Sequence, residues 1–257
     1  MDLGLAGKRA LVLAASRGLG RGIAEALARE GAKVLISGRS GDKLAAIAAA
    51  HPGMGHVVAD LADPASVDVL EAAVAEQLGG IDILVNNTGG PPPGRMVEAD
   101  PAVLARQYDA MVMRPVELTT RLLPQLRAQK WGRILTVGSS GVIQPIPNLG
   151  LSNAIRASLV GWSKSLANDL AAEGITVNML LPGRIHTERV DELDEAAAKR
   201  TGKSLEEARE AAKAAIPAGR YGTVAEFADT AAFLVSERAS YITGSQIRVD
   251  GGAIRSV

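Results

Sequence analysis

The sequence predicts a single α/β domain built on a doubly wound parallel sheet. Short apolar runs alternate with longer segments of helical period along the whole chain of 257 residues. Strands that alternate with helices form parallel sheets covered on both faces. A chain of this length can bury one large core, and 47% of its residues are hydrophobic. We therefore expect one domain over residues 1–257.

The apolar runs are short and bounded by glycine, proline or polar residues, which is typical of strands. The seven expected strands span residues 8–14, 33–37, 56–59, 82–87, 132–138, 175–181 and 246–250. The segments of helical period between them predict helices over residues 18–30, 41–50, 101–130, 152–172 and 223–235. A further helix is expected to begin at residue 64. Gly31 is expected to end the first helix, and Pro115 to kink or break the long one.

One segment interrupts this alternation. Residues 188–216 are charged, rich in alanine and inserted before the last helix–strand pair. They follow the end of a strand, where ligands bind in such sheets. This position favours a helical lid over a substrate pocket, and the alternative is a solvated helical excursion.

Composition excludes several classes of function. Lysine plus arginine and aspartate plus glutamate number 28 each, so no net charge favours nucleic acid or an anionic membrane. The absence of cysteine removes disulfides, thiolate catalysis and cysteine-ligated zinc, and we expect no metal site. No apolar run reaches the roughly 18 residues of a membrane span, and residues 1–8 show no signal peptide, so we expect a cytoplasmic protein.

A glycine-rich turn follows the first strand and opens directly into a helix. Glycine there lets the backbone approach a pyrophosphate, which then faces the positive end of the helix. A simple tight turn is the alternative. The residues expected to contact a dinucleotide here are Ala14, Ser16, Arg17, Gly18, Leu19 and Gly20.

The end of the second strand predicts which nicotinamide coenzyme binds. An acid at this point holds the ribose hydroxyls of NAD, but the sequence has Arg39 and Ser40 after Gly38 and no acid. Arg39 and Arg17 are expected to flank a 2′-phosphate, to which Ser40 donates. The prediction is NADP(H); the alternative is that both arginines are solvated surface charges.

The turn resembles the Thr-Gly-x-x-x-Gly-x-Gly turn of classical short-chain dehydrogenases/reductases, with Leu13 and Ala14 in place of Thr and Gly. Further motifs of that family follow in its order along nearly the whole chain. They are Asp60-Leu61, Asn86-Asn87-Thr88-Gly89, Pro182-Gly183-Arg184-Ile185-His186-Thr187, Gly244 and Asp250-Gly251-Gly252.

The resemblance implies a Rossmann fold, a small-molecule substrate and a homodimer or homotetramer. It also implies further cofactor contacts beside adenine, near the central sheet and on the nicotinamide side. These are Asp60 and Leu61, then Asn87, Thr88 and Gly89, then Pro182, Gly183, Ile185 and Thr187. The extra methyl group of Ala14 is expected to weaken or reshape binding.

The family's catalytic pattern is altered in this chain. The family has a serine at the end of the fifth strand, a tyrosine and a lysine four residues apart on the next helix, and an asparagine on the long helix. By the family's spacing, Ser139 keeps the serine, Ser152 and Arg156 replace tyrosine and lysine, and Met111 replaces asparagine. Ser140 replaces Ser139 if the register shifts by one.

These replacements change the proton chemistry. A serine hydroxyl is a far weaker acid than a phenol, and arginine stays protonated, so it cannot hand over a proton. We expect Ser139 and Ser152 to donate hydrogen bonds beside Arg156 as a fixed charge, since residues four apart share a helix face. Arg156 can stabilise an oxyanion, bind the ribose hydroxyls of the cofactor, or clamp a carboxylate or phosphate of the substrate. The proton then comes through water or His186, unless His186 is only a loop residue. Residues 89–94, with three prolines, form either a rigid pocket wall or an ordinary surface loop.

Three functions are compatible with these residues. The first is an NADP(H)-dependent oxidoreductase for a carbonyl or alcohol, with an atypical proton route. The second is a non-catalytic NADP(H)-binding protein, a sensor or structural subunit. The third is a lyase similar to halohydrin dehalogenases, which have arginine in the lysine position but keep the tyrosine and lack the nucleotide turn.

Overall fold

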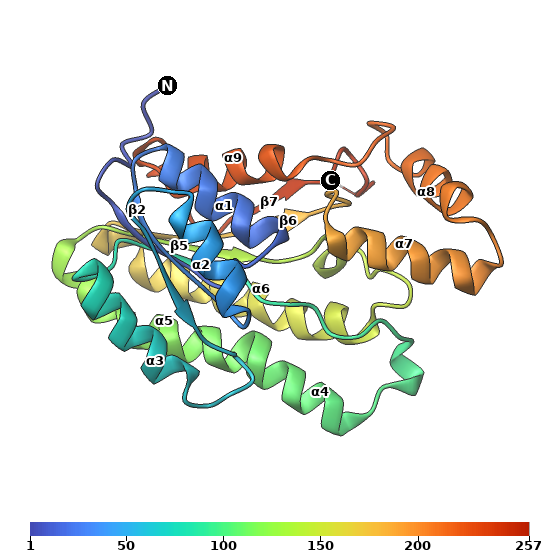
Figure 1. The fold of residues 1–257 in the computed structure, drawn as a ribbon, viewed down its shortest axis with the longest axis horizontal. Coiled ribbons are helices and arrows are strands. Elements are labelled where there is room, and N and C mark those ends of the chain that lie inside the picture. The colour runs from blue at the N-terminus through green and yellow to red at the C-terminus, as the bar shows by residue number, and fades with distance from the viewer. Residues whose placement is uncertain (257) are drawn as a thin grey trace.

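Seven parallel strands form one sheet in the computed structural model, which describes residues 1–256 (Figure 1). The strands are β1 (Arg9–Val12), β2 (Lys33–Gly38), β3 (Met54–Val58), β4 (Ile83–Asn86), β5 (Gly132–Val137), β6 (Ile175–Pro182) and β7 (Gln246–Val249). Their order is β3-β2-β1-β4-β5-β6-β7. This confirms the doubly wound sheet; the last position of the expected domain, 257, lies outside the described residues.

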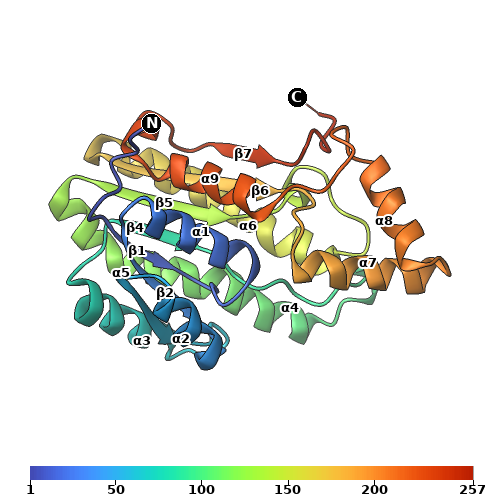
Figure 2. The same ribbon diagram turned by 45° about the horizontal axis from the view of Figure 1, so that its top comes forward.

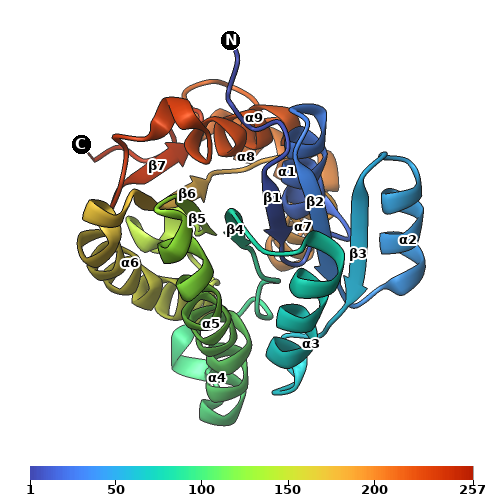
Figure 3. The same ribbon diagram turned by 90° about the vertical axis from the view of Figure 1, so that its left-hand side faces the viewer.

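Helices cover both faces of the sheet, because successive strand side chains point to opposite sides. One face packs against α1 (Gly18–Arg29), α2 (Gly41–Ala49) and α9 (Val224–Leu234). The other packs against α3 (Ser66–Ala73), α5 (Arg114–Gln129) and α6 (Gly150–Leu170). Figure 3 shows α1 and α9 on one side and α3, α5 and α6 on the other.

The strand order reverses between β1 and β4, which become neighbours although β2 and β3 separate them in the chain. The loops after these two strands diverge to opposite faces, and a crevice forms at the carboxyl ends of the strands. The glycine-rich turn after β1 and the Asn-Asn-Thr-Gly motif after β4 both lie at this point.

The long helix expected over residues 101–130 is divided in the structure. It consists of α4 (Pro101–Tyr108), a π-helical segment (Asp109–Met113) and α5, which has Pro115 in its first turn. Proline lacks the N–H that would bond to the carbonyl of Met111 in an unbroken α-helix. The interruption therefore lies just before Pro115, as a wider helical turn and not as a sharp kink.

The segment 188–216 is helical, as predicted. It forms α7 (Glu188–Thr201) and α8 (Leu205–Ala214), separated at Gly202, whose φ is +68°. A capping box of Ser204 and Glu207 begins α8. Figure 2 shows both helices beyond the carboxyl ends of β6 and β7, the edge at which the crevice opens.

Several boundaries differ from the expected ones by about two residues. β3 begins at Met54, α3 at Ser66 and α6 at Gly150, where 56, 64 and 152 were expected. Glycine and proline near these ends weaken the periodic signal. None of the helices described over residues 1–256 is long and apolar enough to cross a membrane.

Close packing of α1 on α9 generates a first prediction. A Cβ atom added at Gly22 of α1 would overlap Cγ1 of Val224 in α9. We expect Gly22→Ala to lower the free energy of unfolding by about 1–3 kcal/mol through overpacking, and to be neutral or stabilising in a Val224→Ala background. Urea denaturation measures both.

Gly161 is the matched control, because it lies in α6 with open space at its Cβ position. Gly161→Ala should raise the free energy of unfolding by up to about 1 kcal/mol through helix propensity alone. Equal effects of Gly22→Ala in both backgrounds would contradict the assigned α1–α9 contact.

Candidate functional site

The glycine-rich turn carries the chain from β1 into α1 and leaves the start of that helix open. Gly18 has a φ of +57°, and Ala14 adopts +48° although it is not glycine. The N-cap residue Arg17 makes no side-chain capping bond, and the first turn of α1 contains no acid. Its backbone N–H groups and the positive helix end are therefore available to an anion.

Asn87 fixes this turn to the end of β4. Its Nδ2 donates to the carbonyl oxygens of Leu13 at 3.1 Å and Ala14 at 3.2 Å. A Cβ atom at Gly20 would lie 2.6 Å from both the Ala14 oxygen and Asn87 Nδ2. Glycine at position 20 thus permits the close approach of helix, turn and strand.

Of the two arginines expected to flank a 2′-phosphate, only one is unpaired. Arg39 is exposed after β2 and makes no hydrogen bond or ion pair to residues 1–256. Arg17 instead pairs through Nη1 with Glu188 at 2.7 Å and Glu192 at 3.2 Å in α7. Ser16 lies beside Gly38, within 3.5 Å of its Cβ position.

The residues after β3 lie at the same edge of the sheet. Asp60 is exposed, and its Oδ1 accepts a hydrogen bond from the backbone N–H of Ala62 at 3.0 Å. Leu61 is half-buried and packs against the core. Ser40 precedes α2 and makes no side-chain cap bond, so its hydroxyl is available.

Arg156 is buried between the ends of β4 and β5, with 8% of its surface exposed. Its Nη1 donates to the carbonyl of Val137 at 2.9 Å and its Nη2 to that of Gly89 at 3.3 Å. No carboxylate among the described residues forms an ion pair with it. Burial, and then the charge of Arg189, lower the pKa of Arg156 to about 10, so it remains a cation at neutral pH.

Two serine hydroxyls lie on the segments adjoining Arg156. Ser139, just after β5, accepts a hydrogen bond at Oγ from the N–H of Gly141 at 3.0 Å and keeps its own proton to donate. Ser152 precedes Arg156 by one turn of α6, is half-buried and makes no side-chain hydrogen bond within residues 1–256. Ser140 is buried and begins a short 3₁₀ turn.

The motif after β6 joins the same edge. Gly183 donates to the carbonyl of Val249 at 2.9 Å, which holds Pro182 and the chain after it against β7. Ile185 is buried. Thr187 Cγ2 lies 3.6 Å from the Cβ position of Gly18, so this motif touches the glycine-rich turn. Thr88 and Gly89 extend from β4 toward the same opening.

The other candidate proton donors each have neighbours of their own. His186 is exposed, with Nε2 3.5 Å from Asp191. Tyr221 donates to Asp194 at 2.8 Å, and burial together with that carboxylate raises the pKa of Tyr221 to about 12. Tyr108 and Met111 pack in an apolar cluster with Ile155.

The first two turns of α7 are held by contacts of residues that the sequence did not single out. Asp194 has 1% side-chain exposure and binds Arg184 and Tyr221. Arg189 donates through Nη2 to the carbonyl of Pro91 at 3.0 Å. The sequence gives no local signal for Asp194 or Arg189. It shows only that Glu188 and Glu192 lie four residues apart and so share one helix face.

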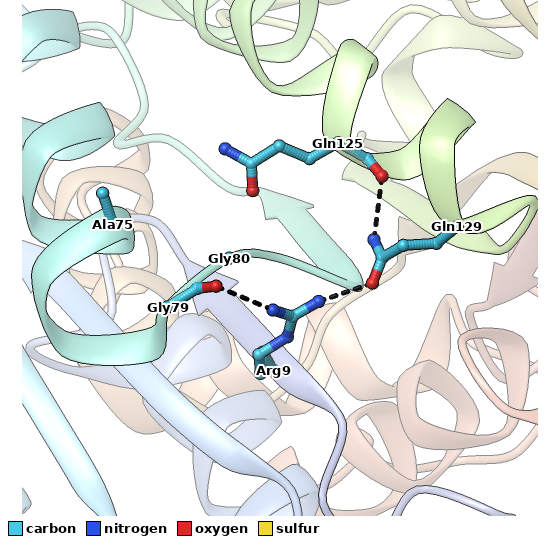
Figure 4. A pocket seen from close by; sticks show the side chains of 6 residues that line it. All are labelled: Arg9, Ala75, Gly79, Gly80, Gln125 and Gln129. Atoms are coloured by element: carbon cyan, nitrogen blue, oxygen red, sulfur yellow. Dashed lines mark hydrogen bonds between the residues drawn. The ribbon is translucent and has the colours of Figure 1, made fainter.

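One hollow lies away from this cluster, and a smaller one adjoins the motif after β6. The larger, about 380 Å³, is lined by Arg9, Gly79, Gln125 and Gln129 at the opposite edge of the sheet (Figure 4). Its arginine is neutralised by Asp82 at 2.9 Å. The smaller, about 100 Å³, lies between the segment after β6 and the end of β7. No group of three potential metal ligands occurs in residues 1–256.

The open start of α1, the turn held by Asn87 and the crevice at the strand-order reversal fit an adenine dinucleotide. Fold and site together define a dinucleotide-binding α/β protein. A family model described as enoyl-(acyl carrier protein) reductase matches residues 13–253. The chain belongs to the short-chain dehydrogenase/reductase family.

Characterised relatives match this chain over nearly its whole length. The 3-oxoacyl-[acyl-carrier-protein] reductase FabG of Vibrio cholerae is 35% identical, over 97% of this chain and 98% of its own. The NADPH-dependent reductase BacG of Bacillus subtilis is 31% identical, over 97% and 99%. The L-sorbose reductase of Gluconobacter frateurii, solved with NADPH and L-sorbose, superposes with a TM-score of 0.94 at 32% identity, over 100% of both chains.

The backbone of Ala14 generates a second prediction. Alanine in the left-handed region costs about 1–2 kcal/mol, so Ala14→Gly relieves strain that outweighs the added freedom of the unfolded chain. We expect the free energy of unfolding to rise by up to about 1 kcal/mol. Chemical denaturation measures it, with Ala15→Gly as the control.

Ala15 is buried and has no positive φ. Ala15→Gly should therefore lower the free energy of unfolding by about 1 kcal/mol. Equal losses in the two variants would show that Ala14 is not strained.

Proposed function

We propose that this protein is an NADP(H)-dependent oxidoreductase that acts on a carbonyl compound or the corresponding alcohol, with a proton route that uses no tyrosine of α6. The buried Arg156 guanidinium, placed at the carboxyl ends of β4 and β5 without a carboxylate partner in residues 1–256, is the observation that carries the proposal. The names of the relatives, which are reductases, support the reaction class.

The proposed coenzyme is NADP(H), which supplies hydride transfer when bound. The first turn of α1 faces its pyrophosphate, and Arg39 with Ser40 faces the 2′-phosphate, where no acid would repel it. Thr187 and Gly89 lie on the nicotinamide side. The relatives include proteins described with NADPH and one solved with NADH, so the preference for the phosphorylated form rests on Arg39.

In the proposed site, Arg156 replaces the family's lysine and Ser152 its tyrosine. Ser139 and Ser152 donate to the substrate oxygen, and Arg156 stabilises the negative charge that develops there. Arg156 holds its proton, so water or His186 delivers the proton that the product requires. Met111, at the family's asparagine position, lies among apolar side chains and offers no polar relay.

The helices α7 and α8 form the proposed lid. Pairing of Glu188 and Glu192 with Arg17 connects the lid to the glycine-rich turn. Asp194 anchors its base to the segment after β6. These contacts support a position for the first turn of α7 beside the proposed dinucleotide, where closure would exclude water from the reacting groups.

A non-catalytic NADP(H)-binding protein is the second candidate. It is favoured by the absence of tyrosine from α6 and by the apolar surroundings of Met111. The two candidates agree on binding and differ on turnover.

Binding and coenzyme preference give a third prediction. Calorimetric titration should show NADPH binding more tightly than NADH. Arg39→Ala should weaken NADPH binding about 10- to 100-fold, the loss of a charge-assisted hydrogen bond, and leave NADH unaffected. Arg29→Ala, an exposed arginine at the far end of α1, is the control. Light scattering on the same sample tests the proposed homodimer or homotetramer.

Turnover gives a fourth prediction. NADPH oxidation against a panel of ketones, imines and enones should reveal a reduced substrate. Arg156→Ala should lower kcat/KM at least about 100-fold by removing charge stabilisation, and Arg156→Lys should recover part of the loss. Binding of NADPH with no turnover across the panel would support the non-catalytic candidate; no binding of either coenzyme would overturn both.

A further inference from the structure

Two arginines from different parts of the chain meet on the loop that follows β4. Arg156, from α6, donates to the carbonyl of Gly89 at 3.3 Å. Arg189, from the first turn of α7, donates to the carbonyl of Pro91 at 3.0 Å and lies about 3.7 Å from the Cβ position of Gly90. Their charges are close enough that Arg189 helps to lower the pKa of Arg156.

The local charges do not cancel. Arg17, Arg156 and Arg189 contribute three positive charges, and Glu188 and Glu192 contribute two negative ones. Both glutamates pair with Arg17, and Glu192 also binds Arg189 at 3.1 Å. These five side chains keep one uncompensated positive charge, and Lys43 adds another close enough to help lower the pKa of Glu188. The most buried member, Arg156, has no acidic partner in residues 1–256.

An unpaired buried cation is costly, because burial removes its hydration and backbone carbonyls replace only part of it. Such a site is stabilised by one negative charge from a ligand. In the proposed coenzyme site, α1 and Arg39 would hold the phosphates, which carry the coenzyme's negative charges. No phosphate would then be left to pair with Arg156.

We propose that the substrate carries a carboxylate, which binds between Arg156 and Arg189 above residues 89–91. The assignment rests on the proposed oxidoreductase function and specifies its substrate class. A carboxylate supplies the negative charge that Arg156 lacks, and the planar guanidinium fork suits its geometry. Gly89 leaves open space at its Cβ position, where the group would lie, while Arg189 packs over Gly90. Pro91 stiffens the loop beneath Arg189.

The test uses the whole protein saturated with NADP⁺. Acetate, oxamate and benzoate are titrated calorimetrically, each beside its neutral amide. At least one acid should bind more tightly than its amide. Arg189→Gln should weaken the binding of that acid about 10- to 100-fold, as expected for the loss of a charge-assisted hydrogen bond. Arg189→Lys should weaken its binding less, because the charge remains.

Arg200→Gln is the matched control, since Arg200 lies exposed on the same helix and outside the cluster. It should leave acid binding unchanged. In turnover, kcat/KM should be higher for phenylpyruvate than for its methyl ester. Arg189→Gln should reduce the ratio of these two kcat/KM values by about the factor by which it weakens acid binding.

The outcomes separate the two proposals. If NADPH binds and neutral carbonyls are reduced, but no acid binds better than its amide, the carboxylate site is wrong and the oxidoreductase function stands. If acids bind in a manner dependent on Arg189 but nothing is reduced, the site stands and the reaction class is wrong. Equal weakening by Arg189→Gln and Arg200→Gln would also overturn the site.

Discussion

The side-chain amide of Asn87 holds together the part of the structure on which the proposed coenzyme site depends. By donating to two successive carbonyls of the glycine-rich turn, it fixes the end of β1 against the end of β4. These strands meet where the strand order reverses. The open start of α1 is therefore aimed into the crevice by a strand distant in sequence, and Gly20 permits the contact because any side chain would displace the amide.

The second half of the site has a different energetic character. Asn87 donates to two backbone carbonyls, whereas Arg156 is a buried cation whose only partners are backbone carbonyls. Groups of this kind reduce the stability of the free protein and favour a ligand that completes them. The proposed site thus combines a neutral, hydrogen-bonded turn, which would position the dinucleotide, with an unpaired buried charge, beside which the substrate would react.

The strands and most helices could be predicted from sequence because a parallel sheet buried on both faces gives continuous apolar runs. The positions of Ser139, Ser152 and Arg156 followed from spacing within a resemblance to a known family. What could not be predicted depends on tertiary contacts. Arg17 pairs with α7, and Arg189 donates to the loop after β4. The sequence contains no local signal for these two contacts, because their partners lie 171 and 98 residues apart. The π-helical segment before Pro115 could not be predicted either, because a proline in a helical pattern indicates only that the helix is interrupted, not how.

The first turn of α7 connects the two halves. Glu188 pairs with Arg17 of the glycine-rich turn, and the next residue, Arg189, donates to the carbonyl of Pro91 in the loop after β4. Consecutive side chains of one helix thus contact the walls on either side of the crevice. A movement of this turn would change both contacts together, so in the proposed site coenzyme exchange and substrate entry would depend on the same helix.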